Sequence, residues 1–154
     1  MSKLAVQFLL GLAFSLFGML SYGYELTIKN HETALHLSQE QLKDLTQETL
    51  KTITPWTNEP EVYSGVSLSA LIAHYQIQAT KVRARALNDY QVEIDLQQAI
   101  NSGAFIASHA EGQPMRLRNK GPFWIVFPWS KYPHLIERKY QDWSIWQLTE
   151  LSFY

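Results

Sequence analysis

Apolar and polar side chains alternate in short stretches along this chain, which predicts strands more often than helices. Tyr24–Lys29 alternates in this way, and Ala34–Leu37 is placed to pair with it across the polar turn 30–32. Ser38 is followed three residues later by Gln41, a capping-box pattern that predicts the start of a short helix.

Further along the chain, the same alternation and capping patterns predict more strands and two more helices. Phe123–Phe127 is an unbroken apolar run, so we expect a strand at the centre of a sheet. Ser67 and Asp95 are expected to cap helices, the second of which ends at Gly103. The other expected strands are Thr49–Thr54, Val62–Tyr63, Lys81–Leu87, Tyr90–Ile94 and Ala104–His109. Strands outnumber helices and their spacing is irregular, which indicates the α+β class.

The first residues have the pattern of a secretion signal. Lys3 precedes an uncharged apolar run from Leu4 to Leu20, and small residues follow at Ser21 and Gly23. We therefore predict a signal peptide at 1–23, cleaved after Gly23, and one mature domain at 24–154. An uncleaved membrane anchor is the alternative. Because no twin arginine precedes the run, we expect the general secretory route and a periplasmic location.

Composition narrows the range of functions. The chain has no cysteine, which excludes disulfides, thiolate catalysis and thiolate metal ligands. A formal net charge of −1 without basic clusters argues against nucleic-acid binding. All five tryptophans lie after the predicted signal, and large flat side chains in that number suit a tight core or a stacking site.

Motifs of the common catalytic and nucleotide-binding classes are missing. The sequence has no His-Glu-x-x-His, Gly-x-Ser-x-Gly, phosphate loop or Gly-x-Gly-x-x-Gly. The histidines do not have metal-ligand spacing, so we expect them to be at the surface or singly hydrogen bonded. They are His31, His36, His74, His109 and His134.

Four blocks of the sequence resemble a known family. The blocks are Val62–Leu68, Ala86–Ile94, Glu111–Pro128 and Ser144–Leu148. In this order they are similar to the molybdopterin-binding domain of the sulfite-oxidase family, above all to its short exported bacterial branch. The resemblance implies the sulfite-oxidase α+β fold, with mixed β-sheets and a few short helices.

The chain departs from that family at the metal ligand. The family's enzymes hold molybdenum through a cysteine in the loop that precedes the block beginning here at Val62. This chain has Ile53–Asn58 in that stretch, with Trp56 near the place of the ligand. An indole does not supply the soft anionic sulfur that such a metal needs, so we expect a pterin as ligand and no molybdenum.

The resemblance also implies a role. Similar exported proteins without the cysteine are pterin-binding regulators, which control a membrane enzyme that makes or degrades cyclic di-GMP. The expected partner is therefore the periplasmic domain of such an enzyme. A pterin needs a flat stacking surface, an acceptor for its amino edge and donors for its carbonyl and tail. The candidates are Trp56 for stacking, Asp89 as acceptor, and Asn88, Arg116 and Lys120 as donors.

Each candidate has a structural alternative. Asn88-Asp89 is also an ordinary hairpin-turn pair, and Arg116, Arg118 and Lys120 alternate as on a solvated strand face. Lys120 is the best of the three basic residues, because family enzymes use a basic residue just before the corresponding Gly-Pro to hold the cofactor.

Two other tryptophans are expected to have a structural role. Trp124 and Trp146 lie in apolar segments and are expected in the core.

Two further functions stay open: a molybdopterin-dependent oxidoreductase, and an interaction module with an empty pocket.

Overall fold

The computed structural model of this chain describes residues 23–154. The predicted signal segment 1–23 lies outside the described residues except for Gly23, so its cleavage stays a prediction. Within the described part, no helix has both the length and the apolar character that a membrane crossing requires.

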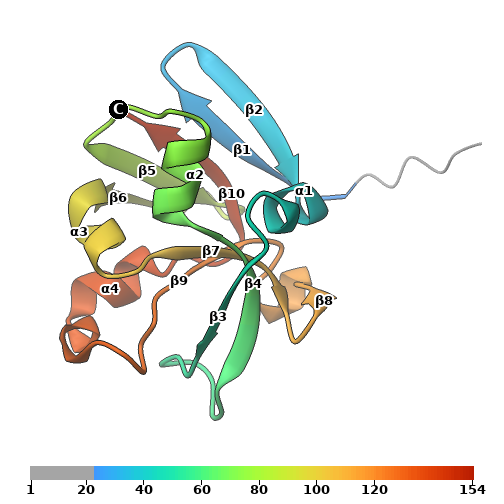
Figure 1. Ribbon diagram of the computed structural model, residues 1–154, viewed down its shortest axis with the longest axis vertical. Helices are drawn as coiled ribbons and strands as arrows, with labels where there is room; N and C mark the ends of the chain where they lie inside the picture. Colours follow the sequence, from blue (N-terminus) through green and yellow to red (C-terminus); the bar gives the residue numbers. More distant parts are fainter. Residues whose placement is uncertain (1–22) are drawn as a thin grey trace, which may run out of the picture.

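Two five-stranded sheets form the framework, and short helices connect their strands (Figure 1). The first sheet has the order β2-β1-β10-β5-β6, and the second has the order β3-β4-β7-β8 with β9 also paired to β7. The strands of the first sheet are β1 (Glu25–Asn30), β2 (Thr33–Ser38), β5 (Lys81–Ala86), β6 (Gln91–Asp95) and β10 (Leu148–Phe153). Those of the second are β3 (Glu48–Thr52), β4 (Glu61–Ser67), β7 (Phe105–Ala110), β8 (Gln113–Pro114) and β9 (Trp124–Val126).

One parallel pair makes the first sheet mixed. β1 lies parallel to β10 with Thr27 opposite Glu150, whereas its other neighbour β2 is antiparallel. The remaining strand pairs of the two sheets are antiparallel. The mixed first sheet, the antiparallel second sheet and the short helices confirm the predicted α+β class.

Side-chain caps begin three of the helices at the predicted residues. Ser38 Oγ accepts a hydrogen bond from the Gln41 backbone N, and the Gln41 side chain accepts one from the Ser38 N, so the capping box is confirmed. Ser67 and Asp95 likewise accept from backbone N–H groups of the first turn. The helices are α1 (Gln39–Asp44), α2 (Leu68–His74), α3 (Leu96–Asn101) and α4 (Arg138–Trp143).

The second sheet buries side chains on both faces. Along β7, Ile106 packs into the large cluster shared with the first sheet, whereas Phe105 and Ala107 belong to a second, smaller cluster. β9 repeats the alternation, with Ile125 in the large cluster and Trp124 in the small one. Because successive side chains on a strand point to opposite faces, one sheet supports both clusters.

The prediction that Phe123–Phe127 forms a central strand is wrong. Only Trp124–Val126 is a strand, and β7 is the strand with which it pairs. Its other edge is bonded to an irregular segment, where the Ile125 N donates to the Ile145 O at 3.1 Å. The run is apolar because it lies between two buried clusters, not because strands flank it on both sides.

Four other segments differ from the sequence-based expectation. β4 is longer than Val62–Tyr63, because a register shift between Ser64 and Gly65 lets the strand continue to Ser67. The basic stretch before Gly121 is no strand face: it forms a 3₁₀ turn, η1 (Leu117–Asn119). The sequence patterns did not predict η2 (Pro133–Ile136) or α4.

Gly65 provides a test of this packing. A Cβ built at Gly65 would overlap the backbone carbonyl of Ile106 on the neighbouring β7, and a backbone atom has little freedom to move aside. We expect Gly65→Ala to lower the free energy of unfolding by at least about 2 kcal/mol. Urea denaturation measures this change. Ser64→Ala, one residue earlier on β4, is the control and should cost less than half as much.

Candidate ligand-binding cleft

A short loop after β3 holds Trp56 in a defined position. The Thr54 N donates to Thr57 Oγ1 at 2.9 Å, and the Trp56 N donates to Thr54 Oγ1 at 3.2 Å, which closes a local turn. The loop is tied to the rest of the fold by the Ile53 N, which donates to Ser130 Oγ at 3.0 Å. The indole of Trp56 is therefore carried by an anchored turn, although the loop itself is largely exposed.

Trp56 lies at the centre of a cluster of four indoles. Its ring centroid is 5.4 Å from that of Trp146, 5.9 Å from that of Trp124 and 6.1 Å from that of Trp129. All three contacts are edge-to-face, the arrangement that the ring quadrupoles favour. Trp56 is half-buried, so one part of its ring remains free for another contact.

The two tryptophans assigned to the core from sequence have different environments. Trp124 is 1% exposed and lies in the small cluster, as predicted. Trp146 is 41% exposed and lies in a bend before β10, so its assignment to the core is wrong. Its exposed ring is available as a binding surface beside Trp56.

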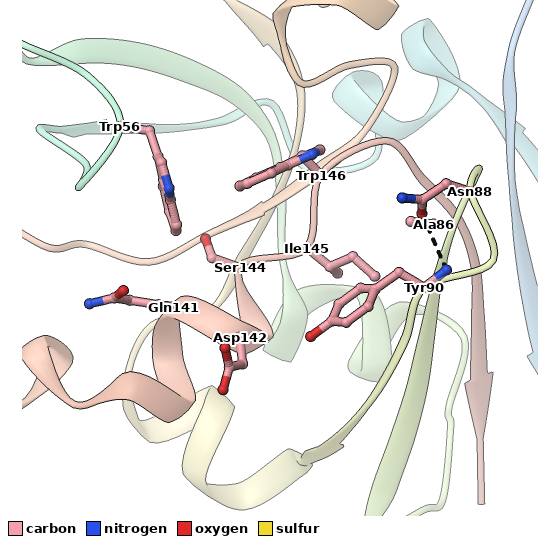
Figure 2. A pocket seen from close by; sticks show the side chains of 9 residues that line it. All are labelled: Trp56, Ala86, Asn88, Tyr90, Gln141, Asp142, Ser144, Ile145 and Trp146. Atoms are coloured by element: carbon pink, nitrogen blue, oxygen red, sulfur yellow. Dashed lines mark hydrogen bonds between the residues drawn. The ribbon is translucent and has the colours of Figure 1, made fainter.

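Trp56 and Trp146 line a first cavity of about 310 Å³. Figure 2 shows Trp56 and Gln141 on one side of it and Asn88 and Tyr90 on the opposite side, with Trp146 between them. The remaining lining residues are Ala86, Asp142, Ser144 and Ile145. The cavity thus has an aromatic wall and polar groups from two separate segments, the β5–β6 turn and α4.

Trp56 also borders a second cavity, of about 650 Å³, whose walls carry opposite charges. Its acidic wall includes Glu61 and Glu111, and its basic wall includes Arg118 and Lys120. Burial, together with the neighbouring Glu61 carboxylate, raises the pKa of the Tyr63 hydroxyl above its usual range. That hydroxyl therefore stays neutral and donates to Glu61 at 2.7 Å.

Lys120 lies against two indoles and makes no ion pair within residues 23–154. Its Nζ is 5.5 Å from the ring centroid of Trp124 and 5.6 Å from that of Trp146, within the range of a cation–π interaction. Its backbone is left-handed, with a φ of 65°, and the next residue, Gly121, approaches the Met115 carbonyl so closely that a side chain there would overlap it. The backbone of this loop thus directs the ammonium group toward the aromatic cluster.

The five residues proposed from sequence do not meet in one cavity. Trp56 and Asn88 share the first, Trp56 and Lys120 share the second, and Arg116 lines another of about 570 Å³. Asp89 lines none of these: its carboxylate is 74% exposed and contacts the Arg85 guanidinium at 2.5 Å. The turn role of Asn88-Asp89 is real, because these residues connect β5 and β6.

Of the residues that line the first cavity, only Trp56 and Asn88 were predicted as ligand contacts; the aromatic and polar residues that sequence reasoning missed are Tyr90, Gln141, Asp142, Ser144 and Trp146. Gln141 and Asp142 belong to α4, which was not predicted. The spacing of Tyr140 and Trp143, both buried on one side of α4, was an available signal for this helix.

His109 departs from the expectation for the histidines. It is 2% exposed, and both of its ring nitrogens are bonded, Nδ1 to Ser108 Oγ at 2.9 Å and Nε2 to Glu40 Oε1 at 2.8 Å. Hydrogen bonds from Lys43 and then from His109 lower the pKa of Glu40 below its usual value. Over residues 23–154, no three His, Asp or Glu side chains are grouped as a metal would require.

Comparison with known proteins adds a family match and a fold match. A family model described as "Oxidoreductase molybdopterin binding domain" matches residues 19–132. Among solved structures, the chain is similar to the sulfane dehydrogenase SoxCD from Paracoccus pantotrophus, with a TM-score of 0.56 and 16% identity. That similarity covers 85% of this chain and 38% of the SoxCD chain, and it shows the fold alone. No curated protein matches the chain.

The indole cluster predicts a graded loss of stability. Trp56→Ala removes three edge-to-face contacts and opens the two cavities into each other, so we expect a loss of about 2 kcal/mol in the free energy of unfolding. Trp146→Ala removes one contact with Trp56 from a more exposed ring and should cost about 1 kcal/mol. Urea denaturation of both variants checks the order. Equal losses would contradict the central place of Trp56.

Proposed function

The chain belongs to the oxidoreductase molybdopterin-binding domain family, and from that premise we propose that it is a non-catalytic pterin-binding protein. The observation that carries the proposal is the first cavity. In it the partly exposed ring of Trp56 faces polar groups of the β5–β6 turn and of α4. Its volume of about 310 Å³ is at the lower end of the range for small-molecule sites and suits a bicyclic ring.

The polar groups of the cavity match the edges of a pterin. A pterin presents an amino group and a ring N–H on one edge and a carbonyl beside them, so it needs a carboxylate acceptor and an amide donor. Asp142 and Asn88 are such groups, and both line the cavity. We assign the acceptor to Asp142 instead of Asp89, because Asp89 lies outside the lining and contacts Arg85.

Lys120 and the second cavity suit the rest of the ligand. The Lys120 ammonium has indole faces on two sides, so part of its hydration is replaced by weaker contacts. A carbonyl or tail hydroxyl of a ligand in the adjoining cleft would supply a stronger acceptor. Because Trp56 borders both cavities, a ring in the first cavity can extend a polar tail toward Lys120 in the second.

The residues of the chain do not fit the molybdenum of the family's enzymes. That metal takes a thiolate from the protein, and the full sequence contains no cysteine. Near Trp56 the charged groups are hard carboxylates and cations, which differ from the soft sulfur donor that this metal prefers. The proposal is therefore binding of an organic pterin without redox chemistry.

We extend the proposal to a regulatory role in the periplasm. It is supported by the predicted signal at 1–23 and by the resemblance to exported pterin-binding regulators of membrane cyclic di-GMP enzymes. The exposed side chains of Tyr90 and Trp146 stand at the rim of the first cavity, where a partner domain would meet both protein and ligand. Release of pterin on denaturing purified protein, identified by mass spectrometry, separates this function from an interaction module with an empty pocket.

We expect biopterin to bind to the wild-type protein and to quench its tryptophan fluorescence. Trp56→Ala should weaken binding at least tenfold by removing the stacking surface. Asp142→Asn should weaken it about tenfold, because a charge-assisted hydrogen bond is replaced by a neutral one or by an opposed donor. Isothermal titration measures both affinities.

Asp89→Asn is the matched comparison for Asp142→Asn. Both substitutions remove one carboxylate charge from an exposed aspartate, but only Asp142 lines the cavity. If Asp89→Asn weakens binding and Asp142→Asn does not, the acceptor is Asp89 and the ligand lies on the hairpin turn. If wild type binds no pterin, the proposed function is wrong.

Metal analysis tests the non-catalytic part of the proposal. Protein purified from the periplasm under native conditions should contain far less than one molybdenum per chain, because no thiolate is present to hold it. Inductively coupled plasma mass spectrometry gives the ratio. Near-equimolar molybdenum would overturn the proposal and favour a molybdopterin-dependent oxidoreductase with a ligand other than cysteine.

A further inference from the structure

Gln147 connects two segments that line the proposed cleft. Its backbone N donates to the Lys120 carbonyl at 3.0 Å, and its side-chain Nε2 donates to the Leu117 carbonyl at 3.1 Å. Its own carbonyl accepts from the Leu87 N at 2.9 Å. The first two bonds reach the loop that carries Lys120, and the third reaches the turn that carries Asn88.

The backbone of Gln147 is held in an uncommon conformation. Its φ is 51°, in the left-handed region that residues other than glycine rarely occupy. Such a conformation persists only where the surroundings fix it on several sides. Here the three hydrogen bonds fix it, and the residue before it is Trp146, whose exposed ring lines the first cavity.

The loop from Met115 to Gly121 is anchored on both sides. On one side the Gln39 side-chain Nε2 lies at 2.9 Å from the carbonyls of both Met115 and Pro122. On the other side the Leu117 and Lys120 carbonyls accept from Gln147. Gln39 thus bonds the two ends of the loop, and Gln147 bonds residues between them.

The geometry points to Gln147 as a positioning residue of the cleft, an inference that rests on the proposed pterin binding. Its hydrogen bonds set Lys120 and Asn88 at fixed places relative to the ring of Trp146. The ligand then meets donors that are already in place, and it does not have to order the loop when it binds. Gln147 itself needs no contact with the ligand.

The variant Gln147→Asn shortens the side chain but keeps a residue type that tolerates a positive φ. Asparagine tolerates the left-handed region better than most residues, so the backbone conformation at this position should add no cost of its own to stability. Its side chain is one methylene shorter and does not reach the Leu117 carbonyl. The matched control is Gln76→Asn: Gln76 also has a φ of 51°, is exposed, and makes no side-chain hydrogen bond within the described residues.

Two measurements are made on the full mature protein. The first is hydrogen exchange without ligand, at the Asn119 and Gly121 amides, both of which donate to the Arg116 carbonyl inside the loop. The second is biopterin affinity by isothermal titration. With Gln147→Asn we expect about fivefold faster exchange at these amides and about fivefold weaker binding, the effect of one lost hydrogen bond. Gln76→Asn should change neither.

The outcomes are distinct. Exchange at Asn119 and Gly121 equal to that of wild type would overturn the inference, because Gln147 would not hold the loop. Faster exchange with wild-type affinity would also overturn it, because the loop would not need to be held for binding. If wild-type protein binds no biopterin, the proposed function fails, and the exchange measurement alone decides whether Gln147 anchors the loop.

Discussion

Alternation of side chains along β7 is the constraint on which both apolar clusters depend. Ile106 points toward the first sheet and helps to close the large cluster, whereas Phe105 and Ala107 point away from it. β9 pairs with β7 so that Trp124 lies opposite Ala107, and the small residue leaves room for the indole. Trp124 in turn supports Trp56, so the cleft rests on the second face of this one sheet.

Local signals in the sequence predicted local structure well. The capping side chains of Ser38, Ser67 and Asp95 begin helices because each cap is satisfied within three residues along the chain. The positions of Trp146 and Lys120 were not predictable in this way. The segment of Trp146 is held beside β9 by the bond from the Ile125 N to the Ile145 O, and the loop of Lys120 is set by the close approach of Gly121 to Met115. Both depend on contacts between residues that are distant in the sequence.

Aromatic surface dominates the cleft around Trp56. The resemblance to the family places Trp56 near the position of the metal-ligating cysteine, and in the structure its neighbours are three more indoles and a lysine without an ion-pair partner among the described residues. Such surroundings favour a flat, polar-edged molecule over a metal ion, because indole faces offer dispersion and a negative quadrupole but no anionic donor. Asp142 and Asn88 line the same cavity, so in the proposed complex they would supply direction and selectivity.

The parallel pairing of β1 with β10 determines when the first sheet can be completed. β10 lies between β1 and β5 in that sheet, yet it follows both of them in the order of synthesis. Until it emerges, the β1–β2 and β5–β6 hairpins are separate units with unpaired inner edges. A chain that is synthesised from its amino end therefore cannot close the central core of this sheet until β10 is available.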